Sequence, residues 1–549
     1  MSLDRTSAPV LDRRHLLSGV ARIAALAGMG SMVPLALRPA FAAAMGADEA
    51  RHLLSRTGFG PTPSEIADLQ GLDYTAAVER ILGKWRAEAM TAPPSWINLT
   101  PPQAREQVER FREQRGEKGR PQAGAPKGKG PGQPGGDLPP RELANANPVQ
   151  ERARELRNWW VEEMLVTDQP FVERMTLFWH NHFTSSLQKV RFTPAVYRQN
   201  LLFRRHALGN FATLLREVAK DPAMLLYLDG AQSRAGQPNE NFARELLELF
   251  TLGEGHYTEA DIKAAARAFT GWSIDRETGS FRFYPALHDK GEKTFFGRTA
   301  NLDGGDVLSL ILEKPQVSEW IVGKLWREFV SLRPDPAEVK RLAVVFREAR
   351  YEIKPLLRAM FLSPAFRDPA NRGALIKSPV ELIVGTIRLL GLPVPEKTRL
   401  VRALQAIGQV PFDPPNVKGW PGGEAWITTN TLLMRQQILR RIVEATTVAP
   451  MGGSPQMAPP RPGRRADRRE QMGDREEVMM DPQERTPVEG RSLRTAGNSA
   501  RLGPTLANLD AVTLQRALLP VPPQVPLDSA IPAGAAVARL LLDPGYQLK

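Results

Sequence analysis

Residues 239–253 read NENFARELLELFTLG, and this stretch decides the fold class. Its pattern predicts a helix over residues 239–252 that ends at Gly253, because glycine readily adopts the left-handed conformation that closes helices. Similar helical patterns follow one another along the chain, separated by short turns marked by Asp-Pro, Gly and Ser-Pro. They cover residues 142–166, 171–180, 194–206, 211–219, 258–271, 317–330, 336–349, 353–362, 379–390, 398–407, 428–446, 510–519 and 530–542.

Strand signals are sparse. Residues 280–284 alternate enough to predict one short strand, with residues 293–296 as its candidate partner. We therefore expect a mainly α fold, a large multi-helix and bundle-like body with at most a small β-hairpin. No fixed repeat period is present, so the pattern does not indicate a regular solenoid.

Two low-complexity segments interrupt the helical pattern, at residues 116–140 and at residues 450–500. Both are rich in Pro and Gly and cannot bury enough apolar surface to offset the entropy of ordering, so we expect disordered insertions. The helical domain is then expected over residues 43–449, interrupted by the first insertion. Residues 501–549 are expected to form C-terminal helices that pack back on that domain.

The first 42 residues have the parts of a twin-arginine signal peptide in order. Arg13-Arg14 precedes a weakly apolar run over residues 20–37, and Ala40-Phe41-Ala42 is a cleavage signal. Charged and helix-breaking residues interrupt the run, which favours cleavage over the alternative of an uncleaved anchor. We expect export of the folded protein to the periplasm or cell surface, with no transmembrane anchor after cleavage.

The charge and composition of the chain limit the classes of molecule that it is expected to bind. The formal net charge is +13 and the chain has no cysteine, so stability in an oxidising compartment has to come from a buried core. The basic excess is compatible with an anionic envelope glycan, an acidic partner or a membrane surface. No nucleic-acid motif is present, and export makes nucleic acid an improbable target.

Histidines and carboxylates predict one candidate metal site. His180 and His182 follow an aromatic helix, Glu245 and Glu248 lie three residues apart on one helical face, and His256 follows a glycine-bounded turn. Imidazoles and carboxylates from neighbouring helices are what a site for one divalent metal requires. A continuous helix through residue 182 would prevent this, because residues two apart point about 200° apart around the helix axis.

The same residues have a structural interpretation. Glu240, Arg244 and Glu248 are spaced as in a salt-bridge ladder on a helix surface. Thr258-Glu259-Ala260-Asp261 resembles a capping box, in which Glu259 and Asp261 cap and charge a helix N-terminus. As candidate acid or base groups we consider Glu245, Glu259 and His288, although His288-Asp289 also fits a hydrogen-bonded turn.

Tryptophans mark a third cluster, at residues 412–426. Proline and glycine stiffen this loop, and Trp420 and Trp426 are candidates for stacking on a glycan. A buried loop that clamps two helices together is the alternative, because tryptophan is mostly buried.

Several familiar activities lose support because their motifs are absent. The chain has no G-x-S-x-G elbow, no G-x-x-x-x-G-K-[ST] phosphate loop, no H-E-x-x-H pair and no cysteine nucleophile.

Six motifs in one order resemble the bacterial family catalogued as domain of unknown function 1800. They are HLLSRTGFG (52–60), FWHNHF (178–183), NENFARELLELFTLG (239–253), YTEAD (257–261), KSPVE (377–381) and PPNVKGWPGG (414–423). The closing DPGYQ (543–547) extends the resemblance over nearly all of the mature chain. The resemblance implies export, a mainly helical body and a neighbouring exported family that resembles sulfatases. It supplies no reaction and no catalytic residue.

Two functions remain open on the sequence. The first is a periplasmic metal-dependent enzyme, such as a hydrolase of an envelope polymer, that uses the imidazoles and carboxylates above. The second is a non-catalytic binding or assembly protein that works with a co-exported, sulfatase-like partner.

Overall fold

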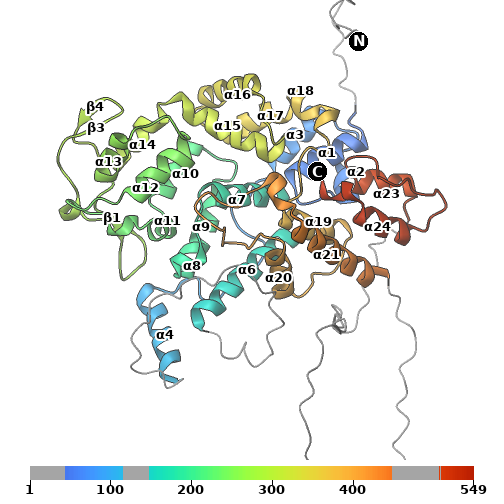
Figure 1. The fold of residues 1–549 in the computed structure, drawn as a ribbon, viewed down its shortest axis with the longest axis horizontal. Helices are drawn as coiled ribbons and strands as arrows, with labels where there is room; N and C mark the ends of the chain where they lie inside the picture. Colours follow the sequence, from blue (N-terminus) through green and yellow to red (C-terminus); the bar gives the residue numbers. More distant parts are fainter. Residues whose placement is uncertain (1–43, 115–146, 448–505, 507) are drawn as a thin grey trace, which may run out of the picture. The chain divides into compact units, whose positions relative to one another are not determined.

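The structure is a computed structural model that describes residues 44–114, 147–447, 506 and 508–549. The predicted signal peptide and both predicted insertions lie outside the described residues. Within them the protein is mainly helical, which confirms the predicted fold class (Figure 1). No helix in these ranges is both long and apolar enough to cross a membrane.

The helices that the sequence predicted agree with the structure within a few residues. The helices up to residue 114 are α1 (Ala47–Thr57), α2 (Pro63–Leu69), α3 (Tyr74–Gly83) and α4 (Pro101–Gln114). The next group is α6 (Pro148–Val166), α7 (Pro170–His182), α8 (Leu187–Val190), α9 (Thr193–Arg205), α10 (Phe211–Ala219), α11 (Pro222–Tyr227), α12 (Glu240–Glu245) and α13 (Glu259–Ala268). Then follow α14 (Gly304–Leu312), α15 (Pro315–Phe329), α16 (Pro336–Glu348), α17 (Ile353–Phe361), α18 (Pro364–Arg367), α19 (Pro379–Leu389), α20 (Lys397–Ala406), α21 (Thr429–Thr447), α23 (Ala511–Leu518) and α24 (Ala533–Leu542). Of these helices, α1 to α4, α8, α11, α14 and α18 were not predicted. Short 3-10 turns lie at η1 (Gly230–Gln232), η3 (Pro285–Leu287), η4 (Pro369–Asn371), η5 (Gly423–Trp426) and η6 (Pro544–Gln547).

Local chemistry explains many of the helix starts. Thr258 and Asp261 form the predicted capping box of α13, and Ser378 and Glu381 form another at α19. Proline occupies the first turn of α7, α9, α15 and α19, where its missing N–H costs nothing.

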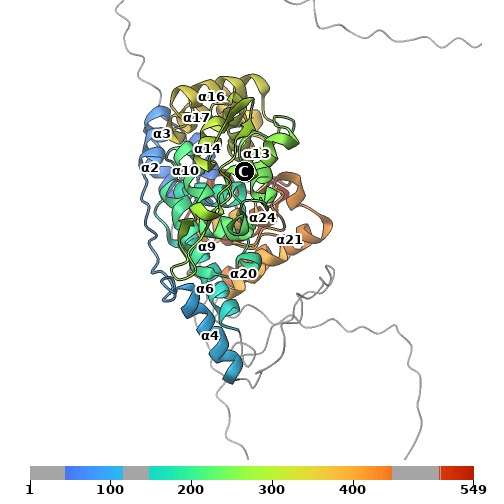
Figure 2. The ribbon, with the colours of Figure 1, turned by 90° about the vertical axis from the view of Figure 1, so that its left-hand side faces the viewer.

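The end of α4 lies away from α16 and α17 in the turned view (Figure 2).

Two short hairpins replace the one that was predicted. β1 (Trp272–Ile274) pairs with β2 (Phe281–Phe283), and β3 (Lys293–Phe295) pairs with β4 (Arg298–Ala300), both antiparallel. The predicted pairing of 280–284 with 293–296 is therefore wrong. Phe296 and Gly297 both have positive φ, so the chain turns back at once and β3 pairs with its immediate neighbour.

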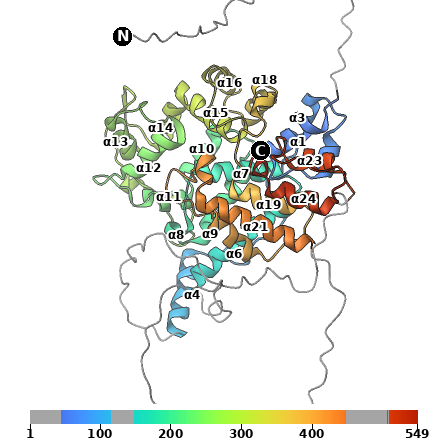
Figure 3. The same cartoon turned by 45° about the vertical axis from the view of Figure 1, so that its right-hand side comes forward.

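The core centres on α6, α7 and α9, whose facing sides bury large aromatic residues. Trp160 and Trp179 are fully buried, and α7 contacts both α9 and α1. Burial of each such ring contributes on the order of 2–3 kcal/mol or more. The C-terminal helices extend this core, since α24 packs on α21 and α23 packs on both α24 and α1 (Figure 3).

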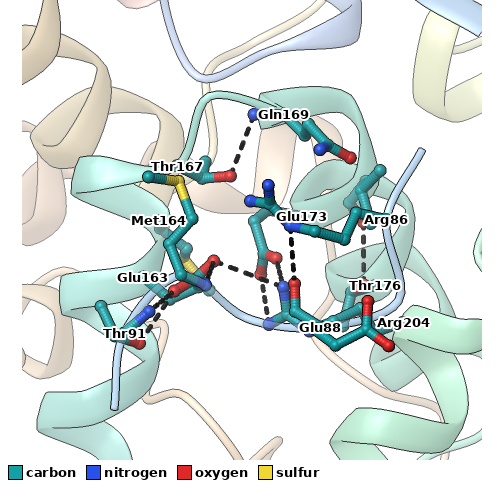
Figure 4. A network of polar contacts seen from close by, with 12 residues as sticks. Arg86, Glu88, Thr91, Glu163, Met164, Thr167, Gln169, Glu173, Thr176 and Arg204 are labelled. Carbon is teal, nitrogen blue, oxygen red and sulfur yellow. Dashed lines mark hydrogen bonds and ion pairs between the residues drawn. The ribbon is translucent and has the colours of Figure 1, made fainter. Parts of the chain in front are cut away.

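A buried ion network ties the three central helices together (Figure 4). Arg204 of α9 pairs with Glu173 of α7 and lies 3.5 Å from Glu163 of α6. The Glu163 carboxylate also accepts hydrogen bonds from the backbone N–H and the hydroxyl of Thr91, both at 2.8 Å. Trp160 donates its indole N–H to Glu173 at 3.0 Å. These partners compensate for taking three charges out of water.

Candidate functional site

His180 is a buried, neutral member of the aromatic core. Its Nε2 lies 3.1 Å from the side-chain amide nitrogen of Asn200, which donates to it. The ring packs against Trp160, Phe203 and Phe412, with centroid separations of 4.7, 4.6 and 5.2 Å. Burial lowers the pKa of His180 to about 3. The imidazole is therefore fixed by packing and by Asn200.

His182 uses both ring nitrogens in hydrogen bonds. Its Nε2 lies 3.1 Å from the Phe250 carbonyl oxygen and donates to it, and its Nδ1 accepts from Lys324 Nζ at 3.2 Å. Lys324 Nζ also donates to the Leu249 carbonyl at 2.9 Å. Burial, followed by the charge of Lys324, holds the pKa of His182 well below its usual range. Burial likewise lowers the pKa of Lys324 to about 7.

The predicted metal site does not assemble. Helix α7 continues to His182, so His180 and His182 project about 200° apart and enter different environments. No three His, Cys, Asp or Glu side chains converge as metal ligands would anywhere in the described ranges. His180, His182, Glu245, Glu248 and His256 are thus not the shared ligand set that their spacing suggested, because the turn needed after residue 180 is absent.

A π-helical turn, η2 (Leu246–Thr251), follows α12. Its carbonyl groups accept hydrogen bonds from His182, Lys324 and Trp320. Its widened geometry is seen in the hydrogen bond from Leu252 N–H to the Leu247 carbonyl, five residues back, at 2.9 Å. The Leu249 carbonyl accepts from both Lys324 and the indole N–H of Trp320. Such turns are frequent at functional sites, and the sequence contained no signal for this one.

Glu245 and Glu248 are the predicted pair that the structure does keep together. Glu245 ends α12 and Glu248 lies in η2, and both are half-buried. Glu248 Oε2 accepts from the Tyr257 hydroxyl at 3.0 Å. Burial, and then the charge of Glu248, raises the pKa of Glu245, while Lys418 and Arg244 oppose the shift. The carboxyl of Glu245 is thus biased towards holding a proton.

The loop at residues 414–423 closes over the end of α7. Gly419 has φ +89°, and a Cβ atom there would lie 2.2 Å from Asn181 Oδ1, so only glycine fits. The next residue, Trp420, donates its backbone N–H to Asn181 Oδ1 at 2.7 Å. The segments 178–183, 239–253 and 414–423 therefore meet at one place, which we call the histidine junction.

Neither tryptophan of this loop presents a face to a ligand. Trp420 is 4% exposed and Trp426 is 6% exposed, and both belong to the hydrophobic core. Stacking on a glycan needs an exposed ring face, so this burial counts against the prediction for Trp420 and Trp426 and agrees with the buried loop of the alternative. The stiffness expected from proline and glycine serves to dock the loop on α7.

Two of the candidate acid or base groups are engaged elsewhere. Glu259 is exposed and binds Arg244 through both oxygens, at 2.7 and 2.9 Å, and these hydrogen bonds lower its pKa. His288 Nδ1 lies 2.9 Å from the Thr270 carbonyl oxygen and donates to it, while Asp289 pairs with Arg267. Arg244 thus pairs with Glu240, as in the predicted ladder, but its second partner is Glu259 and not Glu248. His288 belongs to the predicted turn.

A surface cleft of about 330 Å³ opens beside η2. Exposed His256 lines it, together with Leu252, Trp320 and Arg327. One face of α15 carries Trp320, Lys324 and Arg327. The sequence did not single out this group of side chains. Their spacing of four and three residues was the available signal, but it is also the ordinary spacing of a packed helix face.

The fold and this junction define a mainly helical protein whose two central imidazoles are buried and hydrogen-bonded. Its carboxylate pair lies where α12 passes into η2. A family described as "Protein of unknown function (DUF1800)" matches residues 52–548. The chain belongs to that family. No curated protein and no solved structure matches it.

Proposed function

We propose that this protein is an exported enzyme that performs acid and base chemistry at Glu245 and Glu248, as a hydrolase of an envelope polymer. The observation that supports it is the carboxyl pair itself, in which burial and the neighbouring charge raise the pKa of Glu245. Paired carboxyls whose environments push their pKa values apart are the usual source of a general acid and a general base.

The roles follow from the surroundings of each carboxyl. Glu245 protonates the oxygen of the leaving group, and Glu248, oriented by Tyr257, accepts a proton from the attacking water. The water oxygen bonds to the substrate as the scissile bond breaks, and the two carboxyls exchange protonation states. Lys418 and Arg244 both act electrostatically on Glu245, which favours an anionic polymer such as an envelope glycan.

A divalent metal is no part of this proposal, because a metal at Glu245 and Glu248 would need further ligands that the other predicted residues do not provide. The metal prediction is tested by elemental analysis of protein purified from its native compartment. One equivalent of a transition metal per chain would support the metal prediction.

The experiment compares Glu245→Gln, Glu248→Gln and the control Glu240→Gln in the mature full-length chain. Glu240 lies on the same helix and only pairs with Arg244 at 3.5 Å. Release of new chain ends from peptidoglycan and from anionic envelope polysaccharides is measured against pH. We expect the two site variants to lose about 100-fold or more of the activity and the control to keep it. A wild-type protein that cleaves none of these polymers, or site variants as active as the control, would contradict the proposal.

Export is a separate part of the proposal. Arg13-Arg14 and the cleavage signal at residues 40–42 support it. Replacing both arginines by lysine should hold the chain in the cytoplasm, and the exported wild type should begin at Ala43 by mass spectrometry. An exported protein that retains residues 1–42 would favour the uncleaved anchor.

The alternative of a binding or assembly protein depends on a co-exported, sulfatase-like partner. Burial of Trp420 and Trp426 counts against one of the two surfaces proposed for it, and the basic low-complexity segments lie outside the described residues. Co-purification from the periplasm tests it, and retention of such a partner by a catalytically inert wild type would favour it over the hydrolase.

A further inference from the structure

A second buried polar region lies where α1, α19 and the last residues of the chain meet. Its cavity holds about 20 Å³, which is room for one species of the size of a water molecule. The polar side chains that line it are Arg51, Ser55, Lys377, Glu381, Tyr546 and Lys549. We call this place the cationic cavity.

Arg51 is one of the buried side chains, among the described residues, that the surrounding protein leaves unsatisfied. It is 5% exposed, and its Nε is buried without an acceptor. Among the residues that the structure describes, no carboxylate, carbonyl or hydroxyl accepts a hydrogen bond from its guanidinium. Burial lowers the pKa of Arg51 to about 10, which still leaves it charged at neutral pH. Buried guanidinium groups normally have a partner, because removal from water without one costs several kcal/mol, on the order of 3–5.

Lys377 lines the same cavity but is only half-buried. Its Nζ lies 3.6 Å from the centroid of the Tyr546 ring, and no described residue accepts a hydrogen bond from it. Burial, followed by the charge of Arg51, lowers the pKa of Lys377 to about 7. The Tyr546 hydroxyl shares a hydrogen bond with Thr386 at 2.8 Å. A ring face alone does not replace the hydrogen bonds of an ammonium group.

The nearby carboxylates are already committed to other cations. Glu381 pairs with Arg174 at 2.7 Å and with Lys549, and Glu328 pairs with Arg174 as well. Burial alone would raise the pKa of Glu381, but Arg174 and Lys549 outweigh it and lower this pKa to about 2. Asp48 also acts on Arg51 through its charge, but no ion pair joins the two among the described residues. The cavity is thus lined by more cationic than anionic side chains.

We propose that the cationic cavity binds one small monovalent anion, a halide such as chloride, between Arg51 and Lys377. The two side chains have N–H donors to spare, and the volume admits a single ion of this size but not a tetrahedral oxyanion. The bound ion links α1 to the segment that begins α19 and to the C-terminal residues, so it stabilises the packing of the chain's two ends. This inference is independent of the proposed function.

The test is thermal unfolding of the mature full-length protein in chloride, bromide, formate and gluconate at constant ionic strength. Wild type is compared with Arg51→Gln, Lys377→Met and the control Arg347→Gln, which replaces an exposed arginine. We expect saturable increases of several degrees in Tm with chloride and bromide but not with gluconate, in wild type and control only. Both cavity variants should lose this difference.

Two further outcomes decide the question. If Arg51 has no ligand, Arg51→Gln removes an unpaired buried charge and should raise Tm equally in every salt, which would overturn the proposal. Equal Tm of wild type in chloride and gluconate, or protection by formate and not by chloride, would also overturn the halide assignment. Should the variants not fold, chloride-35 line broadening with wild-type protein, reversed by bromide, is expected, and its absence contradicts the site.

Discussion

The histidine junction and the cationic cavity are both buried and polar, yet they manage charge in opposite ways. At the histidine junction burial prevails, since the pKa of His180 falls to about 3 and that of Lys324 to about 7. At the cationic cavity burial likewise lowers the pKa of Lys377 to about 7, but ion pairing prevails at Glu381, which stays ionised with a pKa of about 2. The difference lies in the partners, because carbonyls and aromatic rings surround the first group of side chains and opposite charges surround Glu381.

The largest effect is expected where the two chain segments at the cationic cavity touch. A Cβ atom at Gly385 of α19 would lie 1.9 Å from the Phe59 carbonyl oxygen, so Gly385→Ala has to push α19 away. We expect a loss of about 4 kcal/mol or more in the free energy of unfolding, measured in urea. Gly83→Ala is the control, because nothing lies within 4 Å of its Cβ position, and it should stabilise by up to about 1 kcal/mol.

The second largest effect is expected from removing a buried charge at the cationic cavity. Glu381→Gln leaves Arg174 and Lys549 short of a buried counter-charge, and we expect it to cost about 3–5 kcal/mol in unfolding experiments. Glu79→Gln breaks only the exposed pair with Arg358 and should cost less than about 1 kcal/mol. Equal losses for the two variants would contradict ion pairing as the stabilising interaction at the cavity.

The histidine junction should respond to pH instead. The folded pKa of Lys324, about 7, lies below its ordinary value of 10.5, so above pH 7 the unfolded chain binds more protons than the folded one. Stability should therefore rise with pH from about 7 towards 10, by roughly 1 kcal/mol per pH unit from this group. Lys324→Met should remove this contribution to the pH dependence of stability. The contribution of Lys377, whose pKa is also about 7, should remain in that variant.

An unchanged slope in Lys324→Met would mean that the amine is charged or solvated in the folded protein. Lys340→Met, at an exposed lysine, is the matched control, and it should leave the slope as it is.

The sequence predicted most of the fold because helix patterns, caps and turns are local. It placed Glu245 and Glu248 together for the same reason, because a spacing of three residues puts two side chains on one face of a helix. It could not predict that α7 continues through His182, because the stop depends on how the loop at Gly419 docks on Asn181, more than 200 residues away. Lys324 and Arg51 were missed because their burial arises from tertiary packing, and neither has a local motif.

The proposed chemistry rests on the protonation of one carboxyl, and titration of Glu245 by carbon-13 NMR measures it directly. We predict a pKa above the ordinary 4.5 in the wild-type protein and a lower pKa in Glu248→Gln, where the neighbouring charge is removed. A wild-type Glu245 that titrates at or below 4.5, unaffected by Glu248→Gln, would contradict the assignment of an acid and a base to this pair.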